Sequence, residues 1–404
     1  MHIEDIRLDF AGREATRFAP FVLVAWFYRD VLHLAERLQQ VTVARKRNWQ
    51  RPRPRYPHTF QDADLCLGVV TVLTLGLTRL SHMNQALHDE QRLAEVIGLP
   101  RWFDQSTAHA YLNQFQRWHV RQLERVNTDL LRDFSGAAEQ SLAVLDVDSM
   151  THSLESKQRE GAVPGFNRAH RGKPCYQWFV GSVGEEIIAQ YLDPGNTYLG
   201  SHVANLMTTA ETKLPQVEQW VWRSDSIFCS ADTLNTAVQR QWLLSLTGRW
   251  NDLVANCAVD WTQWKPYNSQ TRLLDVGLVR PLRKCAHPFR VVLAETRQAD
   301  PGHRKKRDVA HYGIVTNLFA NGSAGQIFEF QHDHGNMENV FKQVKNPLSA
   351  GKMPSQQFRA NEAYLQLVQM AHNSFLWFKK TVCRRVGGPP LLTRLEEHSW
   401  NMPG

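Results

Sequence analysis

The sequence predicts an α/β protein in which an all-α N-terminal region precedes a mixed sheet that carries a β-rich insertion. Apolar residues recur at helical spacing through the first third of the chain, which favours helices there. The run 141–150 then places near-continuous apolar residues before two aspartates, as in a strand buried on both faces. Further β-branched and aromatic runs follow between turn residues, and helical spacing returns near the end.

The composition is that of an ordinary globular protein with an excess of positive charge. Of 404 residues, 43% are hydrophobic and 21% are charged, and the formal net charge is +8. This balance favours a polyanionic partner, most simply nucleic acid. The six cysteines have no paired spacing, so neither a zinc site nor a disulfide framework is predicted, which fits the cytoplasm. No apolar run is long enough to span a bilayer.

Helices are expected in three parts of the N-terminal region. Residues 18–40 and 61–100 show helical spacing, and a longer helix follows the N-cap cluster 104–107. Short helices followed by a capped turn and a longer helix could form a helix-turn-helix DNA reader. They could equally form a plain helical bundle, so the spacing alone leaves the role of this region open.

A basic arm, residues 45–55, lies between the first two helical parts and contains no acid. Its alternating prolines and arginines forbid a helix and favour an extended chain. Such an arm suits the minor groove or the phosphate backbone of DNA, and a solvated linker is the alternative. Its six cations are candidate DNA-binding residues: Arg45, Lys46, Arg47, Arg51, Arg53 and Arg55.

Two aspartates, Asp146 and Asp148, end the buried strand predicted at 142–148. Strand side chains alternate, so both carboxylates point to the same face. Carboxylates at the end of a buried strand are costly unless a cation or hydrogen-bond donors compensate them, and a divalent metal ion is the simplest compensation. A strand that simply enters a polar loop, with both acids solvated, is the alternative.

The rest of the chain alternates strands and helices. A hairpin is predicted from 176 to 192, a helix at 200–214, and a short strand at 220–223 that leads to Asp225. A strand-rich stretch is expected after it, with strands at 251–259, 289–295 and 312–318, and helices are expected at 332–345 and 357–380. A very basic loop within this stretch supplies further DNA-binding candidates: Arg304, Lys305, Lys306 and Arg307.

A third acid, Glu338, lies in the helix predicted at 332–345. Lys342 and Lys345 follow it at i+4 and i+7, so the three side chains share one helix face. They could form a surface ion-pair row worth a few tenths of a kcal/mol. They could instead form a site in which the carboxylate binds metal while the lysines hold phosphates.

The chain resembles the DDE transposases of bacterial insertion sequences. These have an aspartate on the first strand, a second aspartate after the fourth strand and a glutamate on a following helix. These enzymes have a ribonuclease-H-like catalytic domain, here of the branch with a strand-rich insertion before the glutamate. Arg223-Ser-Asp225, taken with Glu338 and Lys345, carries most of the resemblance. Supporting residues are Leu145 to Ser149, Gln158, Gly161, Ala162, Gly165 to Asn167, Pro194 to Thr197 and Val315 to Leu318. The sequence departs from the family where Gln331 and His334 replace the usual tyrosine and arginine.

The resemblance implies metal-dependent DNA cleavage and strand transfer at the ends of an insertion sequence. Asp148, Asp225 and Glu338 would be catalytic and would bind two Mg²⁺ ions, for which Mn²⁺ can substitute, with Asp146 as the reserve ligand. His334, Lys342 and Lys345 would contact phosphates. The partners would be the terminal inverted repeats and target DNA, bound by a homodimer associated with the bacterial nucleoid.

These expectations divide the chain into parts. Residues 1–138 would form the DNA-binding region, residues 139–251 and 326–385 the catalytic domain, residues 252–325 the insertion and residues 386–404 a tail. Two rival functions remain open: a metal-dependent nuclease that cuts without joining, and a weakened or co-opted transposase that only binds DNA. The replacements at Gln331 and His334 are the best support for the second rival.

Overall fold

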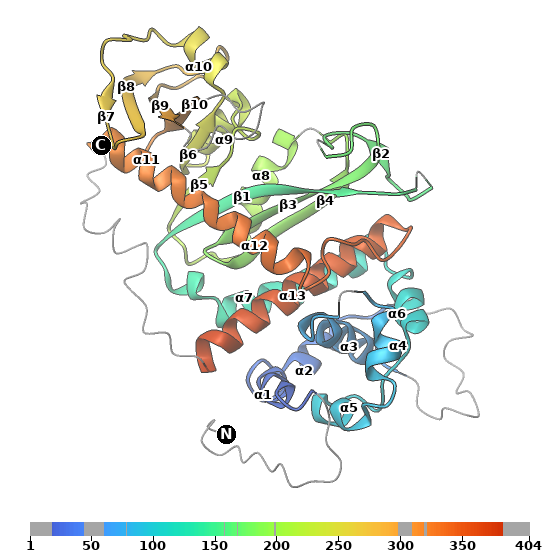
Figure 1. Ribbon diagram of the computed structural model, residues 1–404. Coiled ribbons are helices and arrows are strands. Elements are labelled where there is room, and N and C mark those ends of the chain that lie inside the picture. Colours follow the sequence, from blue (N-terminus) through green and yellow to red (C-terminus); the bar gives the residue numbers. More distant parts are fainter. Residues whose placement is uncertain are drawn as a thin grey trace.

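The computed structural model describes residues 18–43, 60–77, 79–156, 158–167, 169–197, 199–297, 309–318 and 321–382. The basic arm and the basic run 304–307 lie outside these residues. Within them, helices at the N-terminal end pack beside one extended mixed sheet (Figure 1). No helix of the described residues is both long and apolar enough to cross a membrane.

The sheet has the order expected of a ribonuclease-H-like domain at its centre. Strands β4, β3, β1, β5 and β6 lie side by side, with β3 antiparallel to its neighbours and with β5 and β6 parallel to β1. The strands of this central part are β1 (Leu142–Ser153), β3 (Pro174–Val183), β4 (Glu186–Pro194), β5 (Gln219–Ser224) and β6 (Leu243–Gly248). The short strand β2 (Val163–Pro164) pairs with β3.

Four further strands continue the same sheet beyond β6. Antiparallel pairing joins β6 to β10, β10 to β9, β9 to β8 and β8 to β7. Their bounds are β7 (Lys265–Pro266), β8 (Thr271–Val279), β9 (Phe289–Arg297) and β10 (Val309–Thr316). The strands therefore fall where an insertion was expected, but they extend the central sheet and do not form a second one.

The N-terminal helices are shorter than the spacing predicted. The expected helix at 18–40 is broken at His33, which has a left-handed φ of 48°. Asp104 is an N-cap as expected, because it accepts a hydrogen bond of 2.8 Å from the amide of Thr107. It caps only the short helix 105–112, however, and the longer helix begins separately at Arg117. The helices are α1 (Phe21–Trp26), the π-helix η2 (Phe27–Val31), α2 (Leu34–Leu38), α3 (Asp62–Thr74), α4 (His82–Leu87), α5 (Gln91–Ile97), α6 (Gln105–Leu112), α7 (Arg117–Phe134) and the 3₁₀ turn η4 (Gly136–Glu139).

The remaining helices cover the sheet. Helices α8 and α9 lie between successive parallel strands, and α11, η6 and α12 run across the opposite face (Figure 1). Their bounds are η5 (Leu199–His202), α8 (Val203–Lys213), α9 (Ala231–Gln239), α10 (Trp250–Asn256), α11 (Ala324–His332), η6 (Asp333–Gly335), α12 (Asn336–Lys345) and α13 (Phe358–Val382).

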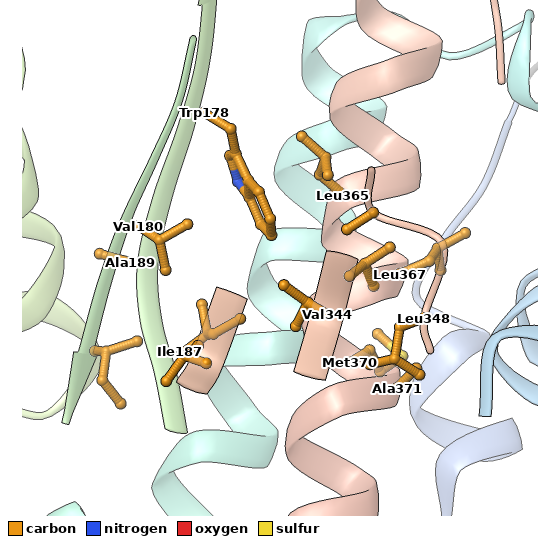
Figure 2. Close-up of a cluster of buried hydrophobic side chains, with 14 of the residues drawn as sticks. Trp178, Val180, Ile187, Ala189, Val344, Leu348, Leu365, Leu367, Met370 and Ala371 are labelled. Atoms are coloured by element: carbon orange, nitrogen blue, oxygen red, sulfur yellow. The ribbon is translucent and has the colours of Figure 1, made fainter. Parts of the chain in front are cut away.

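Helix α13 joins the N-terminal helices to the sheet. It packs against α3 and α7 and also against the edge strand β4, and one apolar core runs through all of them. Figure 2 shows the part of this core that lies between α13, α12 and the strands β3 and β4. Asn373 completes the edge of the sheet, because its side chain accepts from the amide of Ile187 at 3.0 Å and donates to the carbonyl of Ile187 at 2.9 Å. The N-terminal helices are therefore built into the same body as the sheet.

One predicted strand is a helix in the structure, and strand β6 was not predicted. Residues 251–259 were expected to form a strand, but α10 occupies most of this range. Trp250, Leu253, Val254 and Cys257 recur at helical spacing and face the core, a period that outweighs the local β propensity. Strand β6 was not expected, although Leu244 and Leu246 alternate with polar residues in it and are fully buried.

Candidate active site

The pairing of β1 with β5 places the first two acids beside each other. In this parallel pair Asp146 lies opposite Arg223. Side chains repeat on one face every second residue, so Asp148 is the next position on that face of β1. Asp225 is the corresponding next position after Arg223 and directly follows the end of β5. Adjacent strands lie about 4.8 Å apart, which brings two acids distant in sequence into one place. The first aspartate is not at the end of its strand, since β1 continues to Ser153 beside β3.

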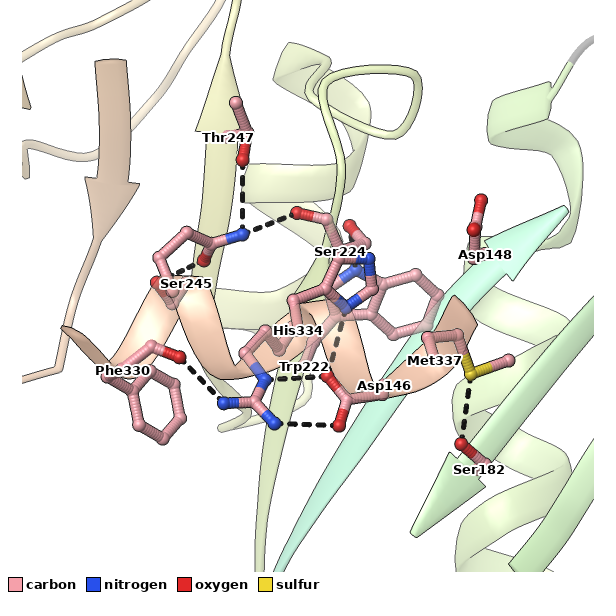
Figure 3. A network of polar contacts seen from close by, with 12 residues as sticks. Asp146, Asp148, Ser182, Trp222, Ser224, Ser245, Thr247, Phe330, His334 and Met337 are labelled. Carbon is pink, nitrogen blue, oxygen red and sulfur yellow. Dashed lines mark hydrogen bonds and ion pairs between the residues drawn. The ribbon is translucent and has the colours of Figure 1, made fainter. Parts of the chain in front are cut away.

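Asp146 is held by a buried ion pair. Its two oxygens accept from Nε and Nη2 of Arg223 at 2.6 and 2.7 Å, and Nδ1 of His334 lies 3.0 Å from one of them (Figure 3). The third guanidinium nitrogen, Nη1, donates to the carbonyl of Phe330 at 2.6 Å. Both residues of the pair are about 4% exposed or less.

This ion pair sets the charge state of Asp146. Burial alone would raise its pKa, but the charge and hydrogen bonds of Arg223, assisted by His334, hold the pKa below its ordinary value. The carboxylate is therefore ionised and its two oxygens already accept hydrogen bonds. That arrangement argues against the expected reserve role of Asp146 as a metal ligand, because a metal ion would have to displace Arg223 from a buried site.

Asp148 has the opposite environment. Its pKa is raised to about 6, and burial is the largest cause. The negative charges of Asp225 and Glu338 also raise the pKa, while a hydrogen bond from the amide of Ser149 and the charge of His334 lower it. The two other acids thus act electrostatically on Asp148, although each lies on a different element. Asp225 itself accepts a hydrogen bond of 3.0 Å from the amide of Ile227 in the loop after β5.

Glu338 lies in the first turn of α12, above the face of the sheet that carries the aspartates. The apolar side of this helix is buried in the core through Met337, Val340 and Val344. The side chain of Glu338 is 73% exposed and pairs with Lys342 at 3.5 Å. It can therefore rotate without breaking a buried contact.

Gln331 and His334 turn inward, toward the sheet. The amide of Gln331 accepts from Oγ of Ser245 at 2.7 Å and donates to the carbonyl of Ser224 at 2.9 Å and to Oγ1 of Thr247 at 3.1 Å (Figure 3). His334 faces Asp146 and not the solvent, which argues against its expected contact with phosphate. Lys342 and Lys345 are exposed on α12.

The residues present fit a hard divalent cation by their chemistry. Among the described residues, no three His, Cys, Asp or Glu side chains are placed so that they could already hold a metal ion. Carboxylate oxygens are nevertheless the donors that Mg²⁺ prefers, and the repulsion that raises the pKa of Asp148 is what such a cation would relieve. Glu338 would complete the set by a rotation of its exposed side chain.

Close contact between two loops accounts for glycines that the sequence had singled out. A Cβ atom on Gly165 would lie 1.8 Å from the carbonyl oxygen of Gly195. The amide of Phe166 donates to that same oxygen at 3.1 Å. Both loops flank the far end of β3, so these glycines shape the edge of the sheet and not the acid cluster itself.

Two residues of the site were missed by sequence reasoning. Arg223 was noticed only as part of a motif, although it precedes Asp225 by the same two positions that separate Asp146 from Asp148, and this matching offset is a usable signal. Gln331 was noticed only as a departure from the family pattern. Its role depends on Ser245 and Thr247 of β6, a strand that was not predicted.

Solved structures of transposases are similar to this chain. A piggyBac transposase synaptic complex with hairpin DNA matches with 11% identity and a TM-score of 0.49, over 93% of this chain and 78% of that chain. The Mos1 mariner paired-end complex with Mn matches with 12% identity and a TM-score of 0.20, over 57% of this chain and 78% of that chain. No curated protein matches the sequence.

The family described as Transposase DDE domain group 1 matches residues 1–387, which is nearly the whole chain. Enzymes of this family generally use divalent metal ions and act on DNA. The match covers Asp148 on β1, Asp225 directly after β5 and Glu338 on α12. The chain therefore belongs to the DDE transposases and is an enzyme of DNA transposition.

Proposed function

We propose that this enzyme cuts DNA at the ends of an insertion sequence and joins the freed 3′-hydroxyl to target DNA. Asp148, Asp225 and Glu338 are its catalytic residues, and they hold two divalent ions, Mg²⁺ by preference, with Mn²⁺ as a substitute. The observation that supports this assignment most is the environment of Asp148, whose pKa of about 6 reflects burial together with repulsion from the other two acids. Bound metal ions would activate the attacking hydroxyl and neutralise charge at phosphorus.

The chain's own residues supply binding and orientation. Asp148 lies on β1 and Asp225 directly follows the neighbouring strand β5, so the two provide a fixed base for the ligand set. Glu338 lies on a separate helix and would complete the set, and its exposed side chain is accessible to a DNA strand. Lys342 and Lys345, exposed on the same helix, are placed to contact the phosphates next to the cut.

The proposed partners are the element's terminal inverted repeats and target DNA. Two ends must be cut and joined together, so we propose a homodimer that binds them at the bacterial nucleoid. The net charge of +8 supports a duplex partner. Light scattering of the protein alone and on paired end duplexes would test the dimer, because a single chain on two ends would contradict it.

A strand-joining assay with the element's own ends tests the proposed function. The wild type should cut and join the ends when Mg²⁺ or Mn²⁺ is present. Asp148→Asn, Asp225→Asn and Glu338→Gln should each lower cleavage on the order of 10³-fold or more while end binding persists. Asp260→Asn, at a fully exposed acid outside the cluster, is the matched control and should behave as wild type.

The same assay separates the two rival functions. Cleavage without joined product would favour a metal-dependent nuclease. End binding without cleavage, in the wild type as in the variants, would favour a protein that only binds DNA. Gln331 and His334 replace a tyrosine and an arginine that are usual in the family, and both turn inward. This is the observation that favours the second rival, a protein that only binds DNA.

A further inference from the structure

We propose that Arg223, Asp146, Gln331 and His334 form a clamp that sets the position of the Glu338 helix over the two aspartates. The clamp residues are positioning residues and do not touch the substrate. This inference rests on the proposed function, because it assigns the three acids to one site. It goes beyond the proposed function by assigning a structural role to Gln331 and His334, the two residues that depart from the family pattern.

The clamp connects three strands to one short segment. Asp146 comes from β1, Arg223 and the carbonyl of Ser224 come from β5, and Ser245 and Thr247 come from β6. All of them bind residues 330–334, at the end of α11 and in η6. The attachment points on the chain are the carbonyl of Phe330, the side-chain amide of Gln331 and the ring of His334 (Figure 3).

Apolar packing alone would not fix the helix. Met337, Val340 and Val344 bury one side of α12, but burial of apolar surface has no preferred direction. Hydrogen bonds and a bidentate ion pair require definite distances and angles, so they select one position among those that the apolar surface permits. Because the clamp lies directly before α12, it fixes where that helix begins.

The position of Glu338 follows from this starting point. Glu338 comes four residues after His334, which corresponds to about 6 Å along a helix. Its own side chain is 73% exposed and reaches outward, so it does not anchor the helix. On the sheet, Asp146 lies two residues before Asp148 on β1, and Arg223 lies two residues before Asp225. The clamp therefore connects the backbone of the third acid to the strands that carry the first two.

The same contacts argue against phosphate binding by Gln331 and His334. Gln331 is 5% exposed, and both its amide oxygen and its amide nitrogen bind the protein. His334 directs Nδ1 to Asp146, and its side chain is 14% exposed. A residue that binds DNA phosphate must reach solvent when DNA is absent, as Lys342 does with 70% of its side chain exposed.

Variants at the clamp and at Lys342 distinguish positioning from phosphate binding. His334→Leu removes the contact with Asp146, and His334→Gln keeps a side-chain donor at this position without a positive charge. Gln331→Met keeps the approximate size and removes the hydrogen bonds. Lys342→Gln on α12 is the matched control for a phosphate contact. Measurements on each full-length variant are end-binding affinity against salt, cleavage at saturating DNA against Mn²⁺ concentration, and the Mn²⁺-induced shift of the melting temperature without DNA.

We expect His334→Leu and Gln331→Met to bind ends within about twofold of wild type with an unchanged salt slope. Cleavage, or the Mn²⁺ concentration that it requires, should worsen by about 10- to 100-fold, as is typical when residues that orient metal ligands are lost. The Mn²⁺-induced thermal shift should shrink in both. His334→Gln should recover most of the cleavage. Lys342→Gln should instead weaken binding and reduce the salt slope by about 0.9.

Two results would overturn the clamp. A flatter salt slope in His334→Leu, not recovered by His334→Gln, would show that His334 binds phosphate. Unchanged cleavage and an unchanged Mn²⁺ shift in both clamp variants would show that the contacts are dispensable. If wild type does not cleave at all, the proposed function fails, yet the thermal shift still tests the clamp, because it compares metal binding in wild type and variants without DNA.

Discussion

Asp146 and Arg223 face each other across β1 and β5, and their ion pair lies two residues before Asp148 on one strand and two before Asp225 on the other. The pair is thus one repeat of the strand away from the acids that we assign to catalysis. A fully compensated carboxylate and a poorly compensated one sit side by side on the same strand. Their opposite pKa shifts, lowered for Asp146 and raised for Asp148, follow from this arrangement.

The first prediction concerns the energy of this ion pair. Arg223→Met should lower the free energy of unfolding by about 3–5 kcal/mol, because it leaves a buried carboxylate without its partner. The double variant Asp146→Leu/Arg223→Met should lose much less than the sum of the single losses, since no lone charge remains buried. Urea denaturation measures all three.

The exposed pair of Lys173 and Glu155 is the control for this cycle. Their side chains are 46% and 87% exposed, so Lys173→Met should cost less than about 1 kcal/mol. Additive losses in the Asp146 and Arg223 cycle would contradict the view that these two charges depend on each other.

The second prediction concerns the pH dependence of stability without metal. The pKa of Asp148 is about 6 in the folded protein and about 3.9 in an unfolded chain, so the folded state binds more protons between these values. Asp148 therefore contributes stability that is fully present below about pH 4 and is lost as the pH rises through 6. The loss should be about 2–3 kcal/mol.

Asp148→Asn tests this pH dependence directly. With a chelator present, the variant should match wild type near pH 4 and exceed it by about 2–3 kcal/mol at pH 7.5. Added Mg²⁺ should raise the melting temperature of wild type more than that of the variant. A stability difference that stays constant from pH 4 to pH 7.5 would argue against a partly buried, repelled carboxylate at this position.

The third prediction concerns the basic arm. Arg51, Arg53 and Arg55 alternate with proline and include no acid between them, so they suit contact with phosphates. Replacing all three with alanine should lower affinity for every duplex and reduce the salt slope by roughly two to three units. Electrophoretic mobility shift at several salt concentrations measures both quantities.

An exposed face of α7 supplies the alternative to the arm. Arg117, Arg121 and Arg125 recur at i, i+4 and i+8 and are exposed. If the arm variant keeps its affinity and slope, the arm is a linker, and alanine at these three arginines should then flatten the slope instead. The two triple variants remove the same charge, so each is the control of the other.

The fourth prediction concerns the unity of the fold. Asn373→Leu leaves the buried amide of Ile187 without its side-chain acceptor, while the carbonyl of Ile187 keeps Gln369 as a donor, so the change should cost about 1–3 kcal/mol. Because α13 also packs on α3 and α7, amide exchange should become faster in those helices as well as in β4. Calorimetry should show a single transition in both proteins. A separate, unperturbed transition of the N-terminal helices would contradict the shared core.

The sequence predicted most strands because their apolar, β-branched and aromatic runs are bounded by turn residues, a pattern typical of strands. Strands β1, β3, β4, β5, β9 and β10 lie close to their predicted positions. Local spacing failed where a short helix and a short strand resemble each other, as at 251–259. It also could not show that the N-terminal helices share a core with the sheet, since contacts between α7 and α13 join residues far apart in the sequence.

For the candidate site, the sequence supplied the acids but not their arrangement. Because strand alternation places Asp146 and Asp148 on the same face, alternation alone does not show which of the two is the catalytic residue. The decision depends on which of the two lies opposite Arg223, and this requires the register between β1 and β5. Likewise, no pattern in the sequence shows whether Gln331 and His334 turn toward solvent or toward the sheet.

The order of synthesis gives helix α13 one more consequence. Its residues 358–382 leave the ribosome after every strand and helix that they hold together. Until then β4 presents an unpaired edge, and α3 and α7 lack the surface against which they pack. A nascent chain can therefore expose Asp148 and Asp225 before its fold is complete. Translation that stops early would leave a chain prone to aggregation, in which the N-terminal helices are not packed against the sheet through α13.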